Sequence, residues 1–298
     1  MKRLCGLVIL SLVATPALAA PTLDGTRDAA YGSALAVQTV ETEFGDNFSE
    51  LNAGYAVVEG GTLYLILTGN MEGNFNKLNI FIDSVPGGEN VITNDTSNGG
   101  NNPTNDGWAG KYAGFTFDAG FAADYLLINR RGGGQFDFDF NSVGNASVVE
   151  ASGSIFGGSP TGVNASVGAS GIGVAFDNSN VAGILGGSGA ADQTAAQAVT
   201  TGLELAIPLA AIGNPGLGST IKISAMINGS NHDYLSNQFL GGLPAGQGNL
   251  GGDGTVGQIN LNQYAGNQYF EVRVIPEPAS LVLAGTALGA LALVRRRK

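Results

Sequence analysis

Residues suited to catalysis are scarce in this chain. Its one histidine, His232, lies in a polar stretch before Asp233, and its one cysteine, Cys5, lies close to the N-terminus. A lone loop histidine is normally solvated, and no nucleophile-elbow motif accompanies it. A zinc site would need more histidine or cysteine. We therefore identify no catalytic residue and expect a protein that is not an enzyme.

Two carboxylates offer the one arrangement that could hydrolyse a glycoside. Asp137 and Asp139 alternate with phenylalanines and point to the same side of a predicted strand. Strand geometry places them about 7 Å apart, within the range of paired acids in glycosidases. Two solvated acids on an outer face is the simpler interpretation, so an envelope hydrolase is the least favoured alternative.

Oxygen-bearing side chains make calcium the best candidate among metals. Calcium prefers carboxylate and amide oxygens, and acidic residues lie in or beside the long polar loop that follows Asp83. No EF-hand spacing is present, and Asn and Asp are also frequent simply because they form turns. The sequence predicts one structural calcium, with Asp83, Asp95 and Asp106 as its candidate ligands.

The aromatic residues after this loop are candidates for sugar binding. Trp108 is the only tryptophan of the chain, and Tyr112 follows one helical turn later. An exposed aromatic ring can stack on a sugar, whereas a buried one would only close the core. We name Trp108 and Tyr112 as candidate ligand-binding residues, and the exposure of Trp108 separates the two interpretations.

Both ends of the chain carry targeting signals. Lys2 and Arg3 precede an apolar stretch, and Ala17-Leu18-Ala19 is a small-residue cleavage site, so residues 1–19 are a predicted signal peptide. The C-terminal segment 275–298 contains a Pro-Glu-Pro triplet, an apolar run over 279–294 and a basic tail. As a helix the run spans about 24 Å, slightly less than a bilayer core. The processing motif consists of Pro276, Glu277, Pro278, Arg295, Arg296 and Arg297.

The charge of the body argues against nucleic acid as a partner. The whole chain has a net charge of −11, and six of its 13 Lys and Arg residues lie in the two terminal segments. The body over 20–274 is therefore more acidic still and is repelled by phosphate. Because it contains no cysteine, a large core or bound ions must stabilise it.

The sequence of the body predicts strands joined by turns. Apolar runs over 55–58 and 62–68 flank Gly60-Gly61, which predicts a hairpin. Alternation predicts further strands over 77–83, 124–130, 135–141, 203–207, 220–227 and 269–274, with a helix over 190–199 and a loop over 228–258. We expect an all-β, antiparallel, jelly-roll-like sandwich with long Gly- and Asn-rich loops, an N-terminal signal helix and a C-terminal transmembrane helix.

The C-terminal triplet, short span and arginine cluster together resemble the PEP-CTERM sorting signal of bacterial surface proteins. The resemblance implies an exosortase-type processing enzyme as partner. It also implies export to the cell envelope or beyond, with at least transient anchoring in the membrane through the C-terminal helix.

The body itself resembles family 9 carbohydrate-binding modules and related DOMON-like domains. The resemblance rests on Leu23-Asp24-Gly25, the later Tyr31, and the strands that read IFID and LELAIPL. Tyr31 stands where that family usually has tryptophan. The resemblance implies a β-sandwich with a structural calcium and an aromatic-lined sugar site.

Two functions follow from these observations. The first is an exported, non-enzymatic protein with a structural or adhesive role in extracellular polysaccharide. The second is a true carbohydrate-binding module that recognises a polysaccharide and holds a structural calcium.

Overall fold

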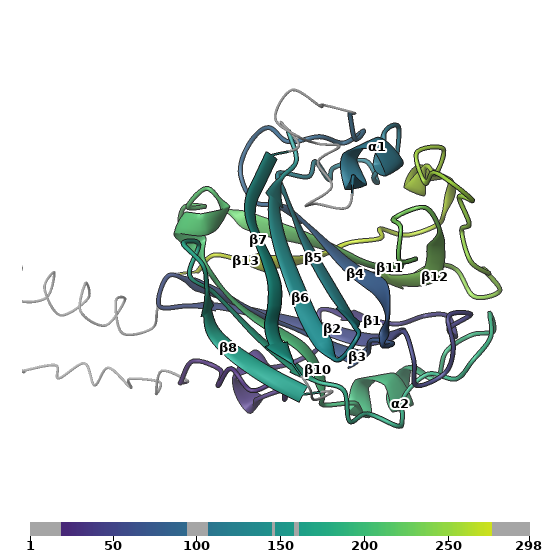
Figure 1. Ribbon diagram of the computed structural model, residues 1–298, viewed down its shortest axis with the longest axis horizontal. Helices are drawn as coiled ribbons and strands as arrows, with labels where there is room; N and C mark the ends of the chain where they lie inside the picture. Colours follow the sequence, from purple (N-terminus) through teal and green to yellow (C-terminus); the bar gives the residue numbers. More distant parts are fainter. Residues whose placement is uncertain (1–18, 94–106, 145–146, 158–160, 276–298) are drawn as a thin grey trace, which may run out of the picture.

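The body is built from antiparallel strands in two facing sheets (Figure 1). The computed structural model describes residues 19–93, 107–144, 147–157 and 161–275. One sheet has the strand order β1-β2-β3-β10-β9-β8, and the other has the order β12-β11-β4-β5-β6-β7, with β13 also paired to β11. The prediction of an all-β sandwich is confirmed at this level.

The strands are β1 (Ala36–Val37), β2 (Glu50–Glu59), β3 (Thr62–Asn70), β4 (Asn74–Asp83), β5 (Tyr125–Gly132), β6 (Gln135–Ser142), β7 (Ser147–Gly157), β8 (Thr161–Val167), β9 (Ile172–Asp177), β10 (Gly202–Pro208), β11 (Thr220–Asn228), β12 (Leu235–Leu240) and β13 (Phe270–Arg273). The helices are short: η1 (Ala29–Tyr31), α1 (Trp108–Tyr112), α2 (Gln193–Ala198), η3 (Leu209–Ile212) and η4 (Leu261–Gln263). None of these is long and apolar enough to cross a bilayer, and the predicted span over 279–294 lies outside the described residues.

The main core lies between the sheets and follows the predicted alternation. Leu78, Ile80 and Ile82 of β4 and the phenylalanines of β6 all point into it and are buried. The hairpin between β2 and β3 turns at Gly60 and Gly61, which both have positive φ values of 57° and 75°. Glycine takes that conformation without strain, so the Gly-Gly signal in the sequence is explained.

A second core covers the outer face of the sheet that contains β4 and β11. The described residues of the connection from β4 to β5, with α1, and the connection from β12 to β13 lie over this face (Figure 1). They contribute buried aromatic rings that form one cluster with Phe81, and Tyr112 and Phe117 contact its ring directly. The contributed rings are Trp108, Tyr112, Phe115, Phe117 and Phe121. The face of β4 that bears Phe81 is therefore an interior surface.

The expected loop over 228–258 contains β12, which the sequence analysis missed. The strand reads LSNQFL, and all six residues are buried. Its polar side chains are satisfied by partners far away in the sequence: Asn237 donates to the carbonyl of Glu41, and Gln238 accepts from Gln38. A buried strand with these polar residues lacks the apolar alternation by which strands are recognised.

Candidate functional site

The aromatic residues proposed for sugar stacking lie in the interior. Trp108 and Tyr112 are both 0 % exposed and belong to the second core. The Tyr112 hydroxyl accepts hydrogen bonds from Asn79 and Asn228 at 2.8 and 2.9 Å, and burial raises its pKa. Neither ring has a free face on which a sugar could stack. Their burial therefore favours the interpretation that Trp108 and Tyr112 close the core.

Of the three proposed calcium ligands, only Asp83 lies in the part of the chain that the structure describes. Asp83 lies at the end of β4, where it accepts a hydrogen bond from the Ala122 amide at 3.1 Å and pairs with Lys222 at 3.4 Å. Asp95, Asp106 and the processing motif lie outside the described residues. Within the described ranges no group of three or more His, Cys, Asp and Glu side chains converges on a metal position. Calcium at Asp83 stays a prediction.

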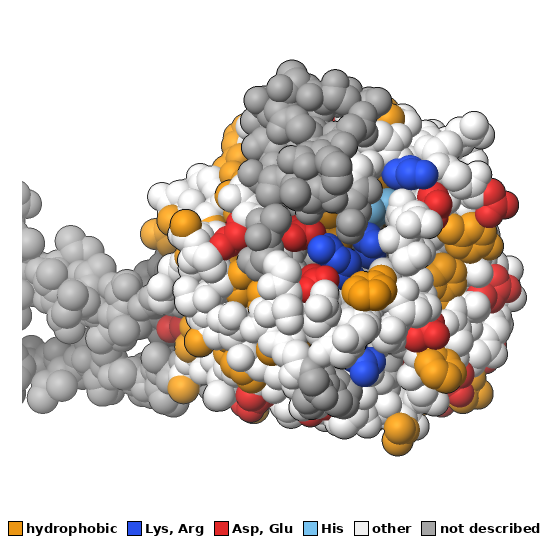
Figure 2. Space-filling view, viewed as in Figure 1, with side chains coloured by type: hydrophobic (Ala, Val, Ile, Leu, Met, Phe, Trp, Pro, Cys, Tyr) orange, Lys and Arg blue, Asp and Glu red, His pale blue; other side chains and the backbone are white. Residues whose placement is uncertain are grey.

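We expected the carboxylates of β6 to be solvated, but the structure buries them. Asp137 and Asp139 are 5 % and 1 % exposed and both pair with Arg130 of β5, at 3.4 and 2.5 Å. Figure 2 shows Lys and Arg side chains beside Asp and Glu side chains on the face that carries these strands. Both acids are therefore members of an ion-paired cluster.

His232 is likewise buried, which corrects the expectation of a solvated loop histidine. It is 0 % exposed, and its ring packs edge-on against Tyr112 with ring centroids 6.1 Å apart. Burial, followed by the positive charge of Lys77 and of neighbouring arginine and lysine, lowers the pKa of its imidazole well below the usual value. The ring is therefore neutral at neutral pH.

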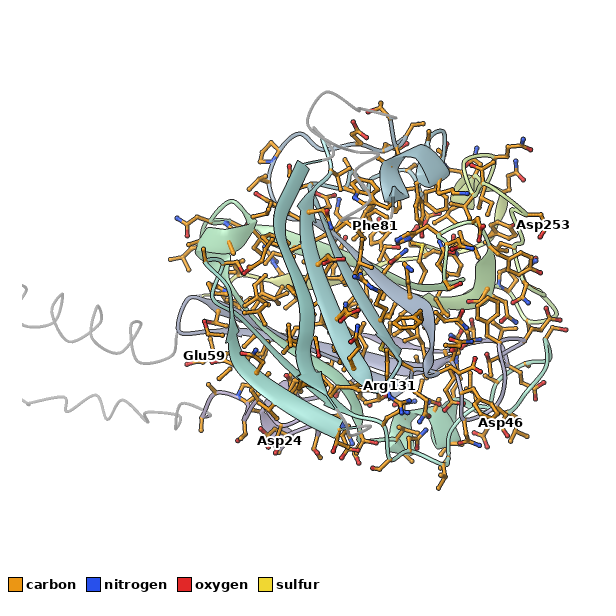
Figure 3. The ribbon with its side chains drawn as sticks, viewed as in Figure 1. Asp24, Asp46, Glu59, Phe81, Arg131 and Asp253 are labelled. Atoms are coloured by element: carbon orange, nitrogen blue, oxygen red, sulfur yellow. The ribbon has the colours of Figure 1, made fainter. Side chains whose placement is uncertain are left out.

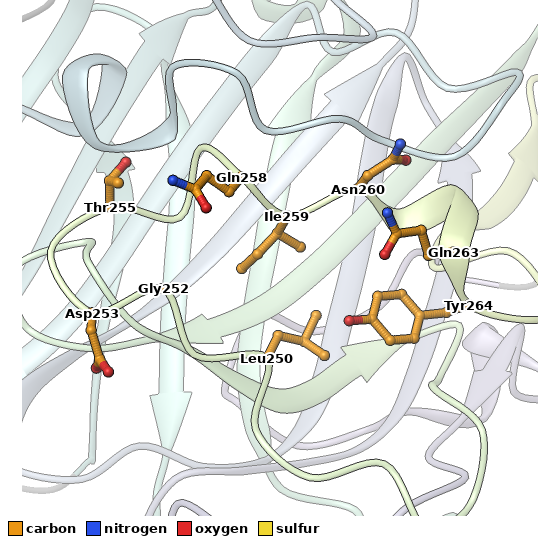
Figure 4. A pocket seen from close by; sticks show the side chains of 9 residues that line it. All are labelled: Leu250, Gly252, Asp253, Thr255, Gln258, Ile259, Asn260, Gln263 and Tyr264. Carbon is orange, nitrogen blue, oxygen red and sulfur yellow. The ribbon is translucent and has the colours of Figure 1, made fainter.

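An open groove lies on the connection between β12 and β13 (Figure 4). Its volume is about 500 Å³. Most of the lining side chains are amides, hydroxyls or a carboxylate, with one aromatic ring. They come from Leu250, Gly252, Asp253, Thr255, Gln258, Ile259, Asn260, Gln263 and Tyr264.

Hydrogen bonds and one close backbone contact fix the position of the connection between β12 and β13. Gly251 exchanges two backbone hydrogen bonds with Leu235 of β12, at 2.7 and 3.0 Å. The hydroxyl of Thr255 donates to the carbonyl of Lys111 at 2.6 Å. Gly257 approaches the carbonyl oxygen of Ala113 so closely that a Cβ atom would lie 1.9 Å from it. Glycine is therefore required for the groove wall to pack on the segment after α1.

Several polar groups in the groove are available to a ligand. Gln258 and Gln263 are exposed, and in the part of the chain that the structure describes their carboxamides make no hydrogen bond. The same holds for the hydroxyl of Tyr264, whose ring is half-buried. Burial raises the pKa of this hydroxyl, so it stays protonated and can donate. Amides and hydroxyls that both donate and accept match the hydroxyl groups of a carbohydrate.

The groove lies far from the ends of the body. The described chain starts and ends at the left of Figure 1, whereas Asp253, at the groove, lies at the right edge in Figure 3. A body tethered through its C-terminus would therefore present the groove away from the tether.

The residues that carried the resemblance to carbohydrate-binding modules have a structural role here. Glu204 of β10 is 0 % exposed. Its carboxylate accepts from the amides of Asp24 and Gly25, both at 2.8 Å, and from the hydroxyl of Tyr31 at 2.7 Å. Because an indole N–H could donate to the same carboxylate, tryptophan and tyrosine can serve one purpose at this position. The motif thus fastens the N-terminal segment to the outer face of the six-stranded sheet.

Sequence reasoning missed the groove because its residues lie in a segment that reads as a loop. The available signal was the density of amides and of the aromatic Tyr264 over 258–264. Comparison of the chain with protein-family models, curated proteins and solved structures finds no match in any of the three.

Proposed function

We propose that this chain is an exported, non-enzymatic protein of the bacterial envelope or extracellular matrix, delivered by a C-terminal PEP-CTERM-type signal. In this proposal a signal helix over 1–19 directs export. A transmembrane helix over 279–294 anchors a jelly-roll-like body until an exosortase-type enzyme removes the tail. The body then has a structural or adhesive role among extracellular polysaccharides.

The order of parts at the C-terminus is the observation that carries this proposal. The Pro-Glu-Pro triplet begins three residues after β13 ends at Arg273, so the signal directly follows the last strand of the body. Proline at 276 and 278 prevents a following helix from extending back toward β13. Glu277 would then lie on extended backbone, accessible to a processing enzyme.

Fractionation of cells that contain an exosortase-type enzyme tests the sorting step. We expect the wild-type chain in the surface or released fraction, and a Glu277→Ala chain retained in the membrane fraction. A matched control, Glu271→Ala, removes an exposed acid of β13 and should sort like the wild type. Identical distribution of the wild-type and Glu277→Ala chains would refute the role of the triplet.

The groove favours a second function, recognition of a neutral glycan. Gln258, Gln263 and Tyr264 offer unused donors and acceptors, while Asp253 would repel a polyanion. The net charge of −11 acts in the same direction. The distance between groove and tether suits contact with polysaccharide outside the cell.

A glycan array probed with the full chain tests this function. We expect binding to neutral glycans, lost on Gln258→Ala combined with Gln263→Ala. Gln193→Ala is the control, because it removes an exposed carboxamide on α2, outside the groove. Binding that survives the double substitution would refute the groove as the site, and release of reducing sugar would instead favour the hydrolase alternative.

A further inference from the structure

The groove on the connection between β12 and β13 has an apolar floor beside polar side chains. Leu250, Ile259 and Tyr264 are half-buried, pack on the second core and line the groove. In Figure 4 the side chains of Leu250 and Ile259 lie in the middle of the lining, and the Tyr264 hydroxyl points toward that middle. Gln258 and Gln263 lie beside them and are exposed. The groove therefore combines a small aliphatic surface with carboxamides.

Backbone contacts hold the aliphatic floor in place before any ligand binds. Ile259 donates its amide hydrogen to the carbonyl of Val256 at 3.0 Å, and its own carbonyl accepts from the amide of Thr116 at 2.9 Å. Leu250 directly precedes Gly251, whose backbone is paired with β12. A floor that is already ordered binds an apolar group without the entropic cost of ordering its own side chains.

Unsubstituted hexoses match this floor poorly. A hexose is recognised through its hydroxyl groups and by stacking on flat aromatic rings, and Tyr264 is the one aromatic residue in the lining. Leucine and isoleucine are branched and suit a small apolar group such as a methyl. A sugar hydroxyl placed on Leu250 and Ile259 would lose its hydrogen bonds to water without replacement. The floor therefore favours a sugar that carries a methyl group among its polar groups.

The carboxamides beside the floor match an amide on the ligand. A carboxamide has one acceptor oxygen and two donor hydrogens, so it can accept from the N–H and donate to the C=O of an acetamido group. Asn260 is already engaged, because its side-chain oxygen accepts from Asn262 at 3.0 and 2.9 Å. Gln258 and Gln263 have no such side-chain partner among the described residues, so they are open to this pairing.

We propose that the groove binds N-acetylated hexosamine residues of a neutral glycan in preference to unsubstituted hexoses. This inference rests on the glycan recognition proposed above and names the class of sugar. The acetamido methyl lies on Leu250 and Ile259, and the acetamido amide pairs with a glutamine of the lining. Asp253, which is exposed at the groove, repels acidic sugars.

Calorimetric titration of the full chain in detergent with matched oligosaccharides tests this preference. The ligands are tetramers of glucose, N-acetylglucosamine and glucosamine, and a tetramer of a 6-deoxyhexose. We expect the N-acetylglucosamine tetramer to bind about tenfold more tightly than the glucose tetramer, because it buries one more methyl group and makes one more hydrogen bond. The glucosamine tetramer lacks the acetyl group, and the 6-deoxyhexose supplies a methyl without an amide. Both should bind more weakly than the N-acetylglucosamine tetramer, in salt that screens the attraction between an amine and Asp253.

One substitution in the floor connects the preference to the structure. Leu250→Asn keeps the size of the side chain but removes its apolar surface, and it should abolish the tenfold preference. The matched control is Leu217→Asn, which changes a leucine that is 72 % exposed and lies outside the groove, and it should keep the preference. If Leu250→Asn does not fold, Ile259→Thr makes the same test at the neighbouring floor position.

The inference is overturned if the glucose and N-acetylglucosamine tetramers bind equally well, or if the floor variant keeps the full preference. It is also overturned if the glucosamine or 6-deoxyhexose tetramer binds as tightly as the N-acetylated one. Each of these results leaves glycan recognition by the groove intact. Binding of none of the four oligosaccharides would instead refute glycan recognition and this inference together.

Discussion

The hydrogen bond from Tyr31 to Glu204 should be one of the strongest single contacts holding the N-terminal segment. The two oxygens lie 2.7 Å apart, and both residues are buried, at 5 % and 0 % exposure. A hydrogen bond to a charged group contributes about 1.5–3 kcal/mol. We therefore expect Tyr31→Phe to lower the free energy of unfolding by about 2 kcal/mol, equivalent to roughly 4–8 °C in the thermal midpoint for a domain of this size.

Urea unfolding followed by fluorescence measures this loss, because Trp108 is the only tryptophan and is fully buried. Tyr64→Phe is the matched control: Tyr64 packs in the same cluster as Tyr31, and no described residue hydrogen-bonds its hydroxyl. That variant should stay within about 0.5 kcal/mol of the wild type.

A second substitution isolates the bond itself. In a Glu204→Gln background the effect of Tyr31→Phe should shrink, because the charged acceptor is gone. An equal loss in both backgrounds, or a loss no larger than that of Tyr64→Phe, would refute the reasoning.

Three further predictions concern the pH dependence of stability, the ion pairs of Arg130 and the packing of Gly257. Burial raises the pKa of the Glu50 and Glu204 carboxyls above their usual value of 4.5, so the folded state retains protons that the unfolded chain releases. The contribution of these groups to stability should therefore fall as pH rises above about 4.5, and Glu204→Gln should flatten that fall in urea titrations across the range. Arg130→Met removes the arginine that pairs with both Asp137 and Asp139 and should cost about 3–5 kcal/mol in the same assay; a loss below 1 kcal/mol would contradict the ion-pair account. Gly257→Ala should lower stability by about 1–3 kcal/mol through its clash with the segment after α1, and an unchanged midpoint would contradict the packing of the groove wall.

The sequence predicted those parts of the fold that depend on local pattern. The Gly60-Gly61 turn and the alternation in β4 and β6 are local signals, and the structure confirms the strands they indicate. The helix over 190–199 is confirmed in shorter form as α2, which begins after the capping residue Asp192. These features could be predicted because backbone geometry and side-chain period act over a few residues.

The remaining features of the fold and of the site depend on contacts between residues that are distant in the chain. Alternation placed Asp137 and Asp139 correctly opposite the phenylalanines, but it could not show that Arg130 pairs with both and that their face is covered. Glu204 and Tyr31 are 173 residues apart. The sequence therefore showed only the short N-terminal motif that contains Tyr31 and did not reveal that its partner is Glu204. The groove was missed for the same reason, because a loop becomes a binding surface only when another segment holds its shape.

The intact mass of the chain recovered from the surface of its own cells tests the central claim most directly. The account predicts a mass that lacks residues 1–19 and the apolar and basic segment that follows the Pro-Glu-Pro triplet. A recovered chain that still contains residues 279–298 would contradict it.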